Sequence, residues 1–343
     1  MKTPSWFLKR NFIACLLWPV SMVYATGFFI VYFYRLFRTN LSKRPAFSNG
    51  KNTGKIPVIC IGGLLAGGVG KTPIVGEIAK FLPNAAVVMR GYKGKRDGGK
   101  GNKLVKKGDS AGDVGDEAKM LSDSGIPVFV GSDREKSIKM AKKAGFLGVV
   151  MDDGFQNPTI EKDISILVFD GKIGIGNGFM LPAGPLREPL NAGLRRADAI
   201  IIIGTMDDGR RTQKIRLPSS IIHHPSSLPV FLAKTESADP GIVGNIVAFA
   251  GIGYPQKFFD GVQKLFGNRL IKTIPFPDHY AYVAADIAQL IAESDRAGAT
   301  PVTTAKDWVK IPEKYKNKIQ VIPLKTTIES AFFKFLKEKL NEA

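Results

Sequence analysis

A glycine-rich segment in the first third of the chain has the residue types of a phosphate-binding loop. Its members are Gly67, Gly68, Val69, Gly70, Lys71 and Thr72. Glycine lets backbone N–H groups close around a phosphate chain, the lysine can reach the outer phosphate oxygens, and the threonine hydroxyl can bind Mg²⁺. The strict pattern has glycine at position 65, where this chain has leucine, and a plain glycine-rich turn does not account for the Lys-Thr pair. The segment predicts a variant phosphate loop that binds a nucleoside triphosphate together with Mg²⁺.

Two adjacent acids, Asp152 and Asp153, end an apolar run at residues 147–151 and precede a glycine. In proteins with a phosphate loop, an acid at the end of a neighbouring strand completes the Mg²⁺ shell beside the loop threonine. A turn-forming pair of acids is the alternative, and such pairs are common. Together with Lys71 and Thr72, the two acids predict a metal site.

A second acidic pair, Asp116 and Glu117, stands before a helix-like segment at residues 118–121. Acids at a helix start interact favourably with the helix dipole, which needs no catalytic role. Phosphoryl transfer to a hydroxyl group also requires a base that accepts the proton, and a carboxylate can serve as that base. His279 could adjust such a base by charge or by a hydrogen bond, although a single histidine is more often structural. The residues alone leave both interpretations of the pair open.

Residues 90–107 form a basic segment with eight lysines and arginines, one acid and several glycines. This composition predicts a flexible cationic loop, which would either be a solvated surface or clamp a phosphate or an anionic lipid head group. Tyr92 is its only aromatic residue, which disfavours a stacking surface for single-stranded nucleic acid. A later segment, residues 177–189, is punctuated by glycine and proline and is predicted to be a loop.

The first part of the chain is both apolar and strongly basic. The formal net charge is +19, and no acid occurs before Glu77, whereas ten lysines and arginines do. Residues 11–34 carry no charge and are rich in aromatic and aliphatic side chains, so they could cross a bilayer as a helix. Basic residues flank this stretch on both sides: Lys9, Arg10, Arg35, Arg38, Lys43 and Arg44. Because such side chains can meet lipid phosphates, the segment predicts attachment to an anionic membrane surface.

Two other interpretations of the apolar stretch are weaker. Residues 23–25 resemble a signal-peptidase site, but the apolar run continues beyond them, and a secreted nucleotide-binding domain would lack cytosolic ATP. A buried core helix would not carry aromatic side chains on nearly every face. Pro19 could divide the stretch into an interfacial piece and a longer helix, so a spanning helix and a helix within one leaflet both remain open.

The cysteines and histidines narrow the class of protein. Cys15 and Cys60 have neither metal-ligand spacing nor a disulfide framework. The three histidines, His223, His224 and His279, leave little room for a histidine-based metal site. A zinc enzyme is therefore not expected.

Short apolar runs alternate with helix-like segments after residue 55, which is the pattern of parallel β-α-β units. These runs lie at residues 58–61, 86–89, 127–130, 148–151, 164–169 and 199–203. Because they lack polar alternation, helices should cover both faces of the sheet. A polar linker with an extended piece at residues 230–233 follows. A second series of runs, at residues 246–250, 301–304 and 321–324, predicts a smaller α/β lobe.

The predicted organisation is an α/β protein of four parts. Residues 1–40 form a membrane-anchor segment, residues 41–222 a parallel-sheet α/β/α lobe with the phosphate loop, residues 223–245 a linker, and residues 246–343 the smaller C-terminal α/β lobe.

Taken together, the motifs resemble the tetraacyldisaccharide 4′-kinase family, membrane-associated enzymes that phosphorylate a lipid A precursor. The matching segments run in order between Leu16 and Lys310. They are residues 16–24 (Leu-Leu-Trp-Pro-Val-Ser-Met-Val-Tyr), 67–73, 90–92 (Arg-Gly-Tyr), 115–117, 152–156 (Asp-Asp-Gly-Phe-Gln), 181–189 (Leu-Pro-Ala-Gly-Pro-Leu-Arg-Glu-Pro), 249–253, 276–279 and 304–307 (Thr-Ala-Lys-Asp). A phosphate loop occurs in many families, whereas this ordered set is highly specific.

The resemblance implies a P-loop kinase-like fold of two α/β/α lobes, a two-stranded linker, an N-terminal membrane helix and ATP bound between the lobes. It implies that Asp116 is the base, assisted by His279, and that Lys71 takes part in catalysis. It assigns nucleotide binding to the phosphate loop with Arg134 and Gln156. It assigns the metal to five residues: Thr72, Glu117, Asp152, Asp153 and Glu188. Three positions depart from the family pattern, with Gly63 in place of an asparagine, Leu65 in place of a serine or threonine, and Asn157 in place of a histidine.

The sequence hypothesis is a kinase at the cytoplasmic face of the inner membrane that moves the γ-phosphoryl group of ATP to the 4′-hydroxyl of tetraacyldisaccharide 1-phosphate. A lipid acceptor and an anionic membrane surface are the expected partners. A membrane-associated P-loop ATPase that switches partner binding is the first alternative. A membrane-tethered nucleic-acid binder, suggested by the net charge of +19, is the second, and neither explains the acidic motifs together with the apolar segment. No nucleic-acid partner is expected.

Overall fold

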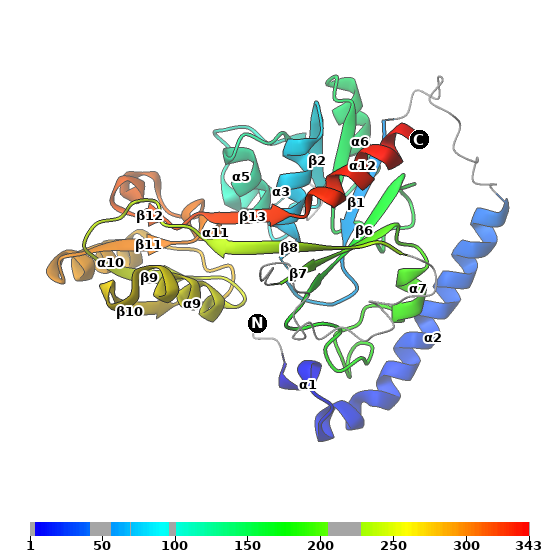
Figure 1. Ribbon diagram of the computed structural model, residues 1–343, viewed down its shortest axis with the longest axis horizontal. Helices are drawn as coiled ribbons and strands as arrows, with labels where there is room; N and C mark the ends of the chain where they lie inside the picture. The colour runs from blue at the N-terminus through cyan, green and yellow to red at the C-terminus, as the bar shows by residue number, and fades with distance from the viewer. Residues whose placement is uncertain (1–3, 42–55, 69, 96–100, 205–227, 343) are drawn as a thin grey trace. The chain divides into compact units, whose positions relative to one another are not determined.

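The computed structural model describes residues 4–41, 56–68, 70–95, 101–204 and 228–342. The larger sheet has the strand order β13-β8-β7-β6-β1-β5-β2-β4-β3, and the smaller sheet has the order β10-β9-β11-β12 (Figure 1). The strands are β1 (Val58–Gly62), β2 (Ala85–Met89), β3 (Lys103–Leu104), β4 (Val128–Val130), β5 (Gly148–Asp152), β6 (Ile164–Asp170), β7 (Ala199–Ile203), β8 (Val230–Ser237), β9 (Asn245–Ala250), β10 (Leu270–Pro275), β11 (Ala299–Thr303), β12 (Gln320–Val321) and β13 (Leu324–Ile328).

The helices that follow these strands are mostly short. The α-helices are α1 (Ser5–Leu8), α2 (Phe12–Leu41), α3 (Lys71–Phe81), α4 (Ala111–Val114), α5 (Asp116–Asp123), α6 (Arg134–Lys143), α7 (Leu190–Leu194), α9 (Pro255–Phe266), α10 (Ala284–Arg296), α11 (Ala305–Trp308) and α12 (Ser330–Glu342). Two 3₁₀ helices are η1 (Gly267–Arg269) and η2 (Glu313–Lys318).

The chain divides into two compact units. The first, which we call the Asp116 unit, consists of Met1–Lys2, Val88–Ser137 and Thr235–Thr326. The second, the P-loop unit, consists of Thr3–Val87, Ile138–Lys234 and Thr327–Ala343. The domain boundaries expected from the sequence, at residues 40, 222 and 245, stay a prediction. The boundary at 222, with His223 and His224, lies outside the described residues.

The P-loop unit is built on parallel strands that are buried on both faces. Strand β1 pairs with β5 on one side and with β6 on the other, and the register places Ile61 opposite Asp152. Every residue of β1, β5, β6 and β7 is buried. Helix α3 contacts both β1 and β5. This layering puts the carboxyl ends of β1 and β5 side by side, which is where ligands bind in open parallel sheets.

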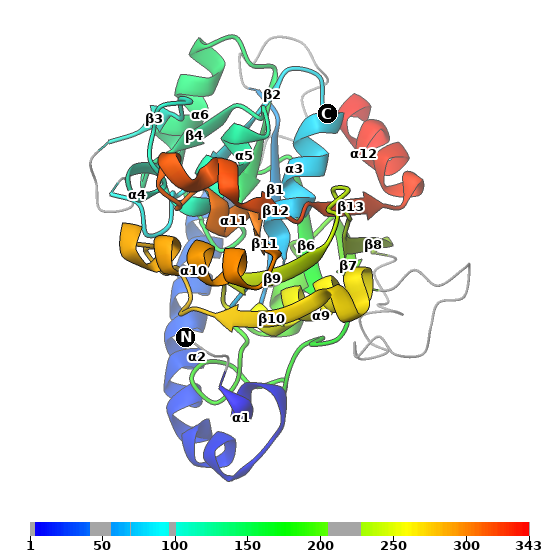
Figure 2. The same cartoon turned by 90° about the vertical axis from the view of Figure 1, so that its left-hand side faces the viewer.

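The Asp116 unit contains the smaller sheet, with helices on both of its faces. Alternate residues of β9 face opposite ways: Ile246, Ala248 and Ala250 pack in one apolar cluster with the phenylalanines of α9, whereas Phe249 packs with α10. Figures 1 and 2 show α9 and α10 on opposite sides of β9. The strands of this sheet run parallel. Short apolar strands covered on both faces are what the sequence pattern predicts.

The α/β fold class predicted from the sequence is confirmed, and the differences concern short or polar strands. The apolar run expected at residues 321–324 is two strands, since β12 ends at Val321 and β13 begins at Leu324. Strand β10 was not predicted, because most of its residues are exposed at the edge of the sheet. The basic segment is not a loop throughout, because β3 lies within it and pairs antiparallel with β4. Residues 96–100 of that segment lie outside the described residues.

The N-terminal apolar stretch forms helix α2 (Figure 1). Its residues Phe12–Val31 are long and apolar enough to cross a membrane by length and composition, and 11% of that window is buried. Pro19 lies inside the helix, which continues through it. A core helix would be mostly buried, whereas most apolar side chains of this window are not covered by the rest of the protein.

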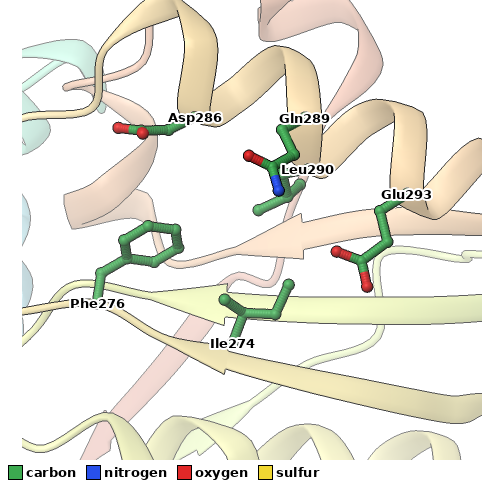
Figure 3. A pocket seen from close by; sticks show the side chains of 6 residues that line it. All are labelled: Ile274, Phe276, Asp286, Gln289, Leu290 and Glu293. Atoms are coloured by element: carbon green, nitrogen blue, oxygen red, sulfur yellow. The ribbon is translucent and has the colours of Figure 1, made fainter.

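A pocket lies in the Asp116 unit, between β10 and α10 (Figure 3). Its volume is about 150 Å³. The lining side chains are Ile274, Phe276, Asp286, Gln289, Leu290 and Glu293. None of the residues predicted to carry chemistry is among them, so the pocket does not mark the site that the sequence indicates.

The two cysteines should differ strongly in reactivity. Cys60 is fully buried in β1, and burial raises the pKa of its thiol to about 12, whereas Cys15 is exposed on α2. Because the thiolate is the reactive form, only about 10⁻⁴ of Cys60 is reactive at pH 8. We expect iodoacetamide to modify Cys15 and to leave Cys60 intact in the folded protein, as measured by peptide mass spectrometry. Protein denatured in guanidinium is the control, where both should react. Rapid labelling of Cys60 in the native Cys15→Ser variant would contradict the expectation.

Candidate active site

The glycine-rich segment connects β1 to the start of α3. Gly67 and Gly70 have φ angles of 114° and 76°, in the left-handed region that glycine adopts readily. Gly70 caps α3, whose first residues are Lys71 and Thr72. The first N–H groups of a helix point away from it and carry partial positive charge, so this end of α3 is suited to a phosphate. Val69, predicted as part of the loop, lies outside the described residues.

Leu65, the departure from the strict phosphate-loop pattern, has a structural explanation. It is 2% exposed and forms an antiparallel β-bridge with Leu186. On either side of it, the N–H of Ala66 donates to the carbonyl of Pro185 at 2.7 Å, and the N–H of Arg187 donates to the carbonyl of Leu64 at 2.8 Å. The residue before the loop is therefore an apolar, sheet-like contact with the segment around Leu186. A polar side chain at this position would have to be buried.

Lys71 and Arg187 share one carboxylate, that of Asp153. The Lys71 Nζ lies 3.2 Å from Asp153 Oδ1, and Arg187 donates to both carboxylate oxygens at 3.2 Å. Burial raises the pKa of Asp153, but the charges and hydrogen bonds of Lys71 and Arg187 outweigh it and hold the pKa below its usual value. Asp153 also has a positive φ of 50° directly after β5. The carboxylate is thus ionised and forms the counter-ion of two cations at the start of α3.

The oxygen-bearing side chains predicted to bind Mg²⁺ include an acid at the end of a strand and a threonine at the start of a helix that contacts this strand. Asp152 is the last residue of β5, is 4% exposed and lies in register with Ile61 of β1. The phosphate loop connects β1 to Thr72 in α3. Carboxylate and hydroxyl oxygens suit Mg²⁺, which usually completes its shell with water and substrate phosphates. In the described part of the chain, no group of three or more His, Cys, Asp or Glu side chains could hold an ion alone. The residues present therefore fit Mg²⁺ bound together with a nucleotide.

Glu188 is fully buried and both of its oxygens are engaged. Gln156 donates from Nε2 to Glu188 Oε1 at 3.0 Å and also to the carbonyl of Gly63 at 3.0 Å. Arg196 pairs with Glu188 Oε2, and its guanidinium lies 4.6 Å from the centre of the Phe155 ring. Glu188 and Gln156 therefore link the segment after β5 to the segment before the phosphate loop. Their predicted roles in metal and nucleotide binding stay predictions.

The Arg196–Glu188 pair should contribute strongly to stability. Removing one partner of a buried ion pair leaves the other charge uncompensated in a low dielectric. We expect Arg196→Ala to lower the free energy of unfolding by about 3 kcal/mol, measured by urea denaturation. Arg195→Ala is the matched control, since Arg195 is exposed one residue earlier. Equal stability of the two variants would contradict this expectation.

In the Asp116 unit, Asp116 and His279 form a hydrogen-bonded pair. His279 Nδ1 lies 2.9 Å from Asp116 Oδ2, and the two side chains are 12% and 13% exposed. A carboxylate oxygen is a hydrogen-bond acceptor, so we assign Nδ1–H as the donor of this bond. His279 has a positive φ of 59°, and its N–H donates to the carbonyl of Gly251 at 3.0 Å. The backbone of this turn thus aims the imidazole at Asp116.

Close packing of glycines fixes the start of α5, where Asp116 stands. Gly115 has a φ of 92°, and a Cβ at Gly91 would lie 2.7 Å from the carbonyl oxygen of Val114. The Tyr92 ring, next to Gly91, meets the His279 ring edge-on with centroids 5.8 Å apart. Both interpretations of the Asp116–Glu117 pair therefore have a structural basis, because the acids begin a helix and one of them also bonds His279.

Two lysines of the segment 304–310 contact the same acids. Lys306 Nζ lies 3.0 Å from Glu117 Oε1. Burial lowers the pKa of Lys306, but the charge and hydrogen bond of Glu117 outweigh it and hold the pKa above its usual value. Lys310, 6% exposed, lies 2.7 Å from the fully buried Asp307 and 4.0 Å from Asp116 Oδ2. Both acids at the start of α5 therefore have a lysine of this segment nearby.

Three hydrogen-bond donors hold the carboxylate of Asp307, which pairs with Lys310. It accepts from the Tyr282 hydroxyl at 3.1 Å, from the N–H of Gly251 at 3.0 Å and from Thr304 Oγ1 at 2.8 Å. Burial and the charge of Asp307 raise the pKa of Tyr282 well above its usual value, so the hydroxyl remains a donor. The Thr-Ala-Lys-Asp motif thus orders the residues around Asp116.

The structure brings the predicted residues together in two sets. The P-loop unit holds Lys71, Thr72, Asp152, Asp153, Gln156 and Glu188, and the Asp116 unit holds Asp116, Glu117 and His279, with Arg134 at the start of α6. Sequence reasoning assigned no role to several contacting residues: Arg187, Arg196, Tyr282, Lys306, Asp307 and Lys310. Arg187, Lys306 and Asp307 stood inside recognised motifs, which was the signal available. Asn157, where the family has histidine, accepts from the N–H and hydroxyl of Thr159 and so shapes a turn.

A strand, a glycine loop and a helix that begins with Lys-Thr, beside an acid at the end of the neighbouring parallel strand, define a P-loop nucleotide-binding protein. The sequence profile of the family described as tetraacyldisaccharide-1-P 4′-kinase matches residues 13–341. The chain belongs to this family.

Similar proteins cover nearly the whole chain. A tetraacyldisaccharide 4′-kinase of Rhodospirillum rubrum is 39% identical over 336 residues, which are 96% of this chain and 94% of that protein. One of Phenylobacterium zucineum is 38% identical over 340 residues, covering 96% of each. A crystal structure of the "apo" form of LpxK from Aquifex aeolicus in complex with ATP matches with a TM-score of 0.70 and 26% identity, over 96% of this chain and 98% of that one.

Proposed function

We propose that this chain is an ATP-dependent lipid kinase that transfers the γ-phosphoryl group of ATP to the 4′-hydroxyl of tetraacyldisaccharide 1-phosphate, a step of lipid A biosynthesis. Membership of the tetraacyldisaccharide-1-P 4′-kinase family, over residues 13–341, is the observation that carries this function. The relatives of 35–42% identity bear the same kinase name. The roles of individual residues are proposed from the geometry of the two sets described above.

In the P-loop unit, the N-terminal end of α3 and Lys71 bind the phosphates. Lys71 offers a positive charge to the oxygens of the transferring group, whose negative charge must be stabilised during transfer. Thr72, Asp152 and Asp153 supply the oxygens for Mg²⁺. When bound with ATP, Mg²⁺ neutralises phosphate charge as a Lewis acid. Asp153, already ionised as the counter-ion of Lys71 and Arg187, needs no proton loss to take part.

In the Asp116 unit, Asp116 accepts the proton of the acceptor hydroxyl. Its Oδ2 is held by His279, which leaves the other oxygen, Oδ1, for the substrate. The imidazole orients the carboxylate and stabilises its charge before transfer. Lys310, 4.0 Å from Asp116 Oδ2, adds a second positive charge nearby. The proton-accepting pair and the phosphate-binding residues would serve one reaction.

Helix α2 and the basic residues near it would place the enzyme at the lipid. The acceptor is a lipid, and α2 displays an apolar window that is only 11% buried. We propose that α2 attaches the chain to the anionic surface of the inner membrane, with both units on the cytoplasmic face where ATP is available. The side chains of Arg35 and Arg38, and residues Lys43 and Arg44, lie outside the described part of the structure.

A labelling assay tests the function directly. The purified chain in detergent is incubated with γ-labelled ATP, Mg²⁺ and tetraacyldisaccharide 1-phosphate, and the lipid is extracted and separated. We expect label in the lipid with the intact chain and none with Lys71→Ala. ATP turnover without labelled lipid would favour the P-loop ATPase switch instead.

A further inference from the structure

Helix α2 carries two polar side chains that point toward the protein. Ser21 is 4% exposed, and its hydroxyl donates to the carbonyl of Met180 at 2.9 Å and accepts from the N–H of Ala183 at 2.9 Å. Tyr24, one turn later on the same face of the helix, donates from its hydroxyl to the carbonyl of Arg187 at 2.9 Å. Both residues belong to the Leu-Leu-Trp-Pro-Val-Ser-Met-Val-Tyr motif.

These contacts are more than a lipid anchor requires. Side chains elsewhere along α2, such as Phe12, Leu16 and Val23, are apolar and exposed, which is what contact with lipid needs. A buried hydroxyl costs free energy unless it is hydrogen-bonded, and the Ser21 hydroxyl finds both of its partners within residues 180–187. The Tyr24 side chain is 40% exposed, and its hydroxyl bonds a carbonyl of the same segment. The polar face of α2 is therefore matched to that segment.

The segment 180–187 leads straight to the charged residues beside the phosphate loop. Its backbone pairs with Leu64 and Ala66, immediately before the loop. Its last side chain, Arg187, holds both oxygens of Asp153, which in turn holds Lys71. The Tyr24 hydroxyl bonds the backbone carbonyl of Arg187, and the guanidinium of Arg187 bonds Asp153. A shift of that peptide group would move the guanidinium relative to Asp153.

We propose that Ser21 and Tyr24 are positioning residues of the kinase reaction: they seat residues 180–187 so that Arg187 stays on Asp153 beside Lys71. The inference rests on the proposed function and gives α2 a second role besides membrane attachment. Both side chains bond backbone groups of residues 180–187 and would influence the reaction indirectly, through the position of Arg187. The helix is then part of the phosphate-binding structure as well as the lipid contact.

The test compares Tyr24→Phe and Ser21→Ala with Thr26→Val, a matched control on the same helix whose hydroxyl donates to the helix carbonyl of Met22. Loss of one such hydrogen bond should lower kcat/KM for ATP about 5-fold in Tyr24→Phe, and about 25-fold in Ser21→Ala, which loses two. KM for the lipid acceptor and binding to vesicles of phosphatidylethanolamine and phosphatidylglycerol should not change. Tm should stay unchanged in Tyr24→Phe and should fall in Ser21→Ala, which leaves the buried N–H of Ala183 without its acceptor. Thr26→Val should match the unchanged chain.

Coupling to Arg187 separates positioning from a structural role. In an Arg187→Ala background, Tyr24→Phe should have almost no further effect, because the group it positions is gone. Three results would each overturn the inference. The first is that the effects of Tyr24→Phe and Arg187→Ala multiply in full, and the second is that both variants of α2 keep activities within 2-fold of the unchanged chain. The third is that the loss in Tyr24→Phe is accompanied by a matching loss of Tm or of vesicle binding. If the unchanged chain labels no lipid, the proposed function fails separately. In that case, the affinity for ATP, measured by calorimetry, tests the inference. Tyr24→Phe should bind ATP about 5-fold more weakly than the unchanged chain, and equal binding would overturn the inference.

Discussion

Replacing Asp116 by asparagine should lower kcat by about 10² to 10⁴-fold, which is the usual contribution of a general base. The amide has the shape of the carboxylate but cannot accept the hydroxyl proton. It can still receive the hydrogen bond from His279 Nδ1, which lies 2.9 Å from Oδ2, so the fold and the affinity for ATP should be retained. The measurement is steady-state transfer of γ-label to the lipid acceptor, with Tm recorded for each variant.

Two comparisons make this prediction specific. Asp123→Asn is the control on the same helix, since Asp123 pairs with Lys119 at the other end of α5 and should be dispensable for turnover. His279→Gln should cost less than Asp116→Asn, and the double variant should be no slower than Asp116→Asn alone, because residues that act as a unit are not additive. Activity of Asp116→Asn within 3-fold of the unchanged chain would remove Asp116 from the role of base.

Lys71→Met should lower kcat/KM for ATP by about 10² to 10³-fold, the usual cost of removing one group that stabilises charge in the transition state. Methionine keeps most of the length of the lysine without its charge. Asp153 would retain Arg187 as its partner, with both carboxylate oxygens at 3.2 Å, so little stability should be lost. Both kcat and KM for ATP should be measured, because a loss confined to KM would mean that Lys71 binds ATP without assisting transfer.

The control for Lys71 lies on the same helix. Lys80 is near the end of α3, is 53% exposed and pairs with Glu77 at 2.9 Å. Lys80→Met should leave turnover unchanged, which shows that loss of a positive charge from α3 is not in itself harmful. If both variants lose activity equally, a general effect of charge would replace the specific role of Lys71.

The parallel core could be predicted because its strands are unbroken apolar runs. Strands β1, β5 and β7 are buried along their whole length, so their residue types alone mark them. Strand β3 has two residues, one of them Lys103, whose charge is balanced by Asp109 at 2.6 Å. Nothing local distinguishes such a strand from a loop, because its pairing with β4 comes from distant sequence.

The candidate site could be predicted where residues with suitable chemistry are adjacent in the sequence, as in Lys71-Thr72 and Asp152-Asp153. It could not be predicted where a contact joins distant segments. Gln156 and Glu188 are 32 residues apart, and the Asp116–His279 bond spans 163. Sequence spacing carries no information on which acid meets which cation, so the partners Arg187, Arg196 and Lys310 emerged only with the fold.

The hydrogen bonds that α2 makes with the rest of the P-loop unit bear on how the enzyme can be handled. A shortened chain that begins after Leu41 would be attractive for solubility, because it lacks the exposed apolar window. It would also expose the N–H of Ala183 and the carbonyls of Met180 and Arg187, which Ser21 and Tyr24 otherwise satisfy. Kinetic constants, inhibitor screens or crystals obtained from such a fragment would describe an enzyme with an altered support for its phosphate-binding residues. The whole 343-residue chain in detergent or nanodiscs is the appropriate preparation for quantitative work.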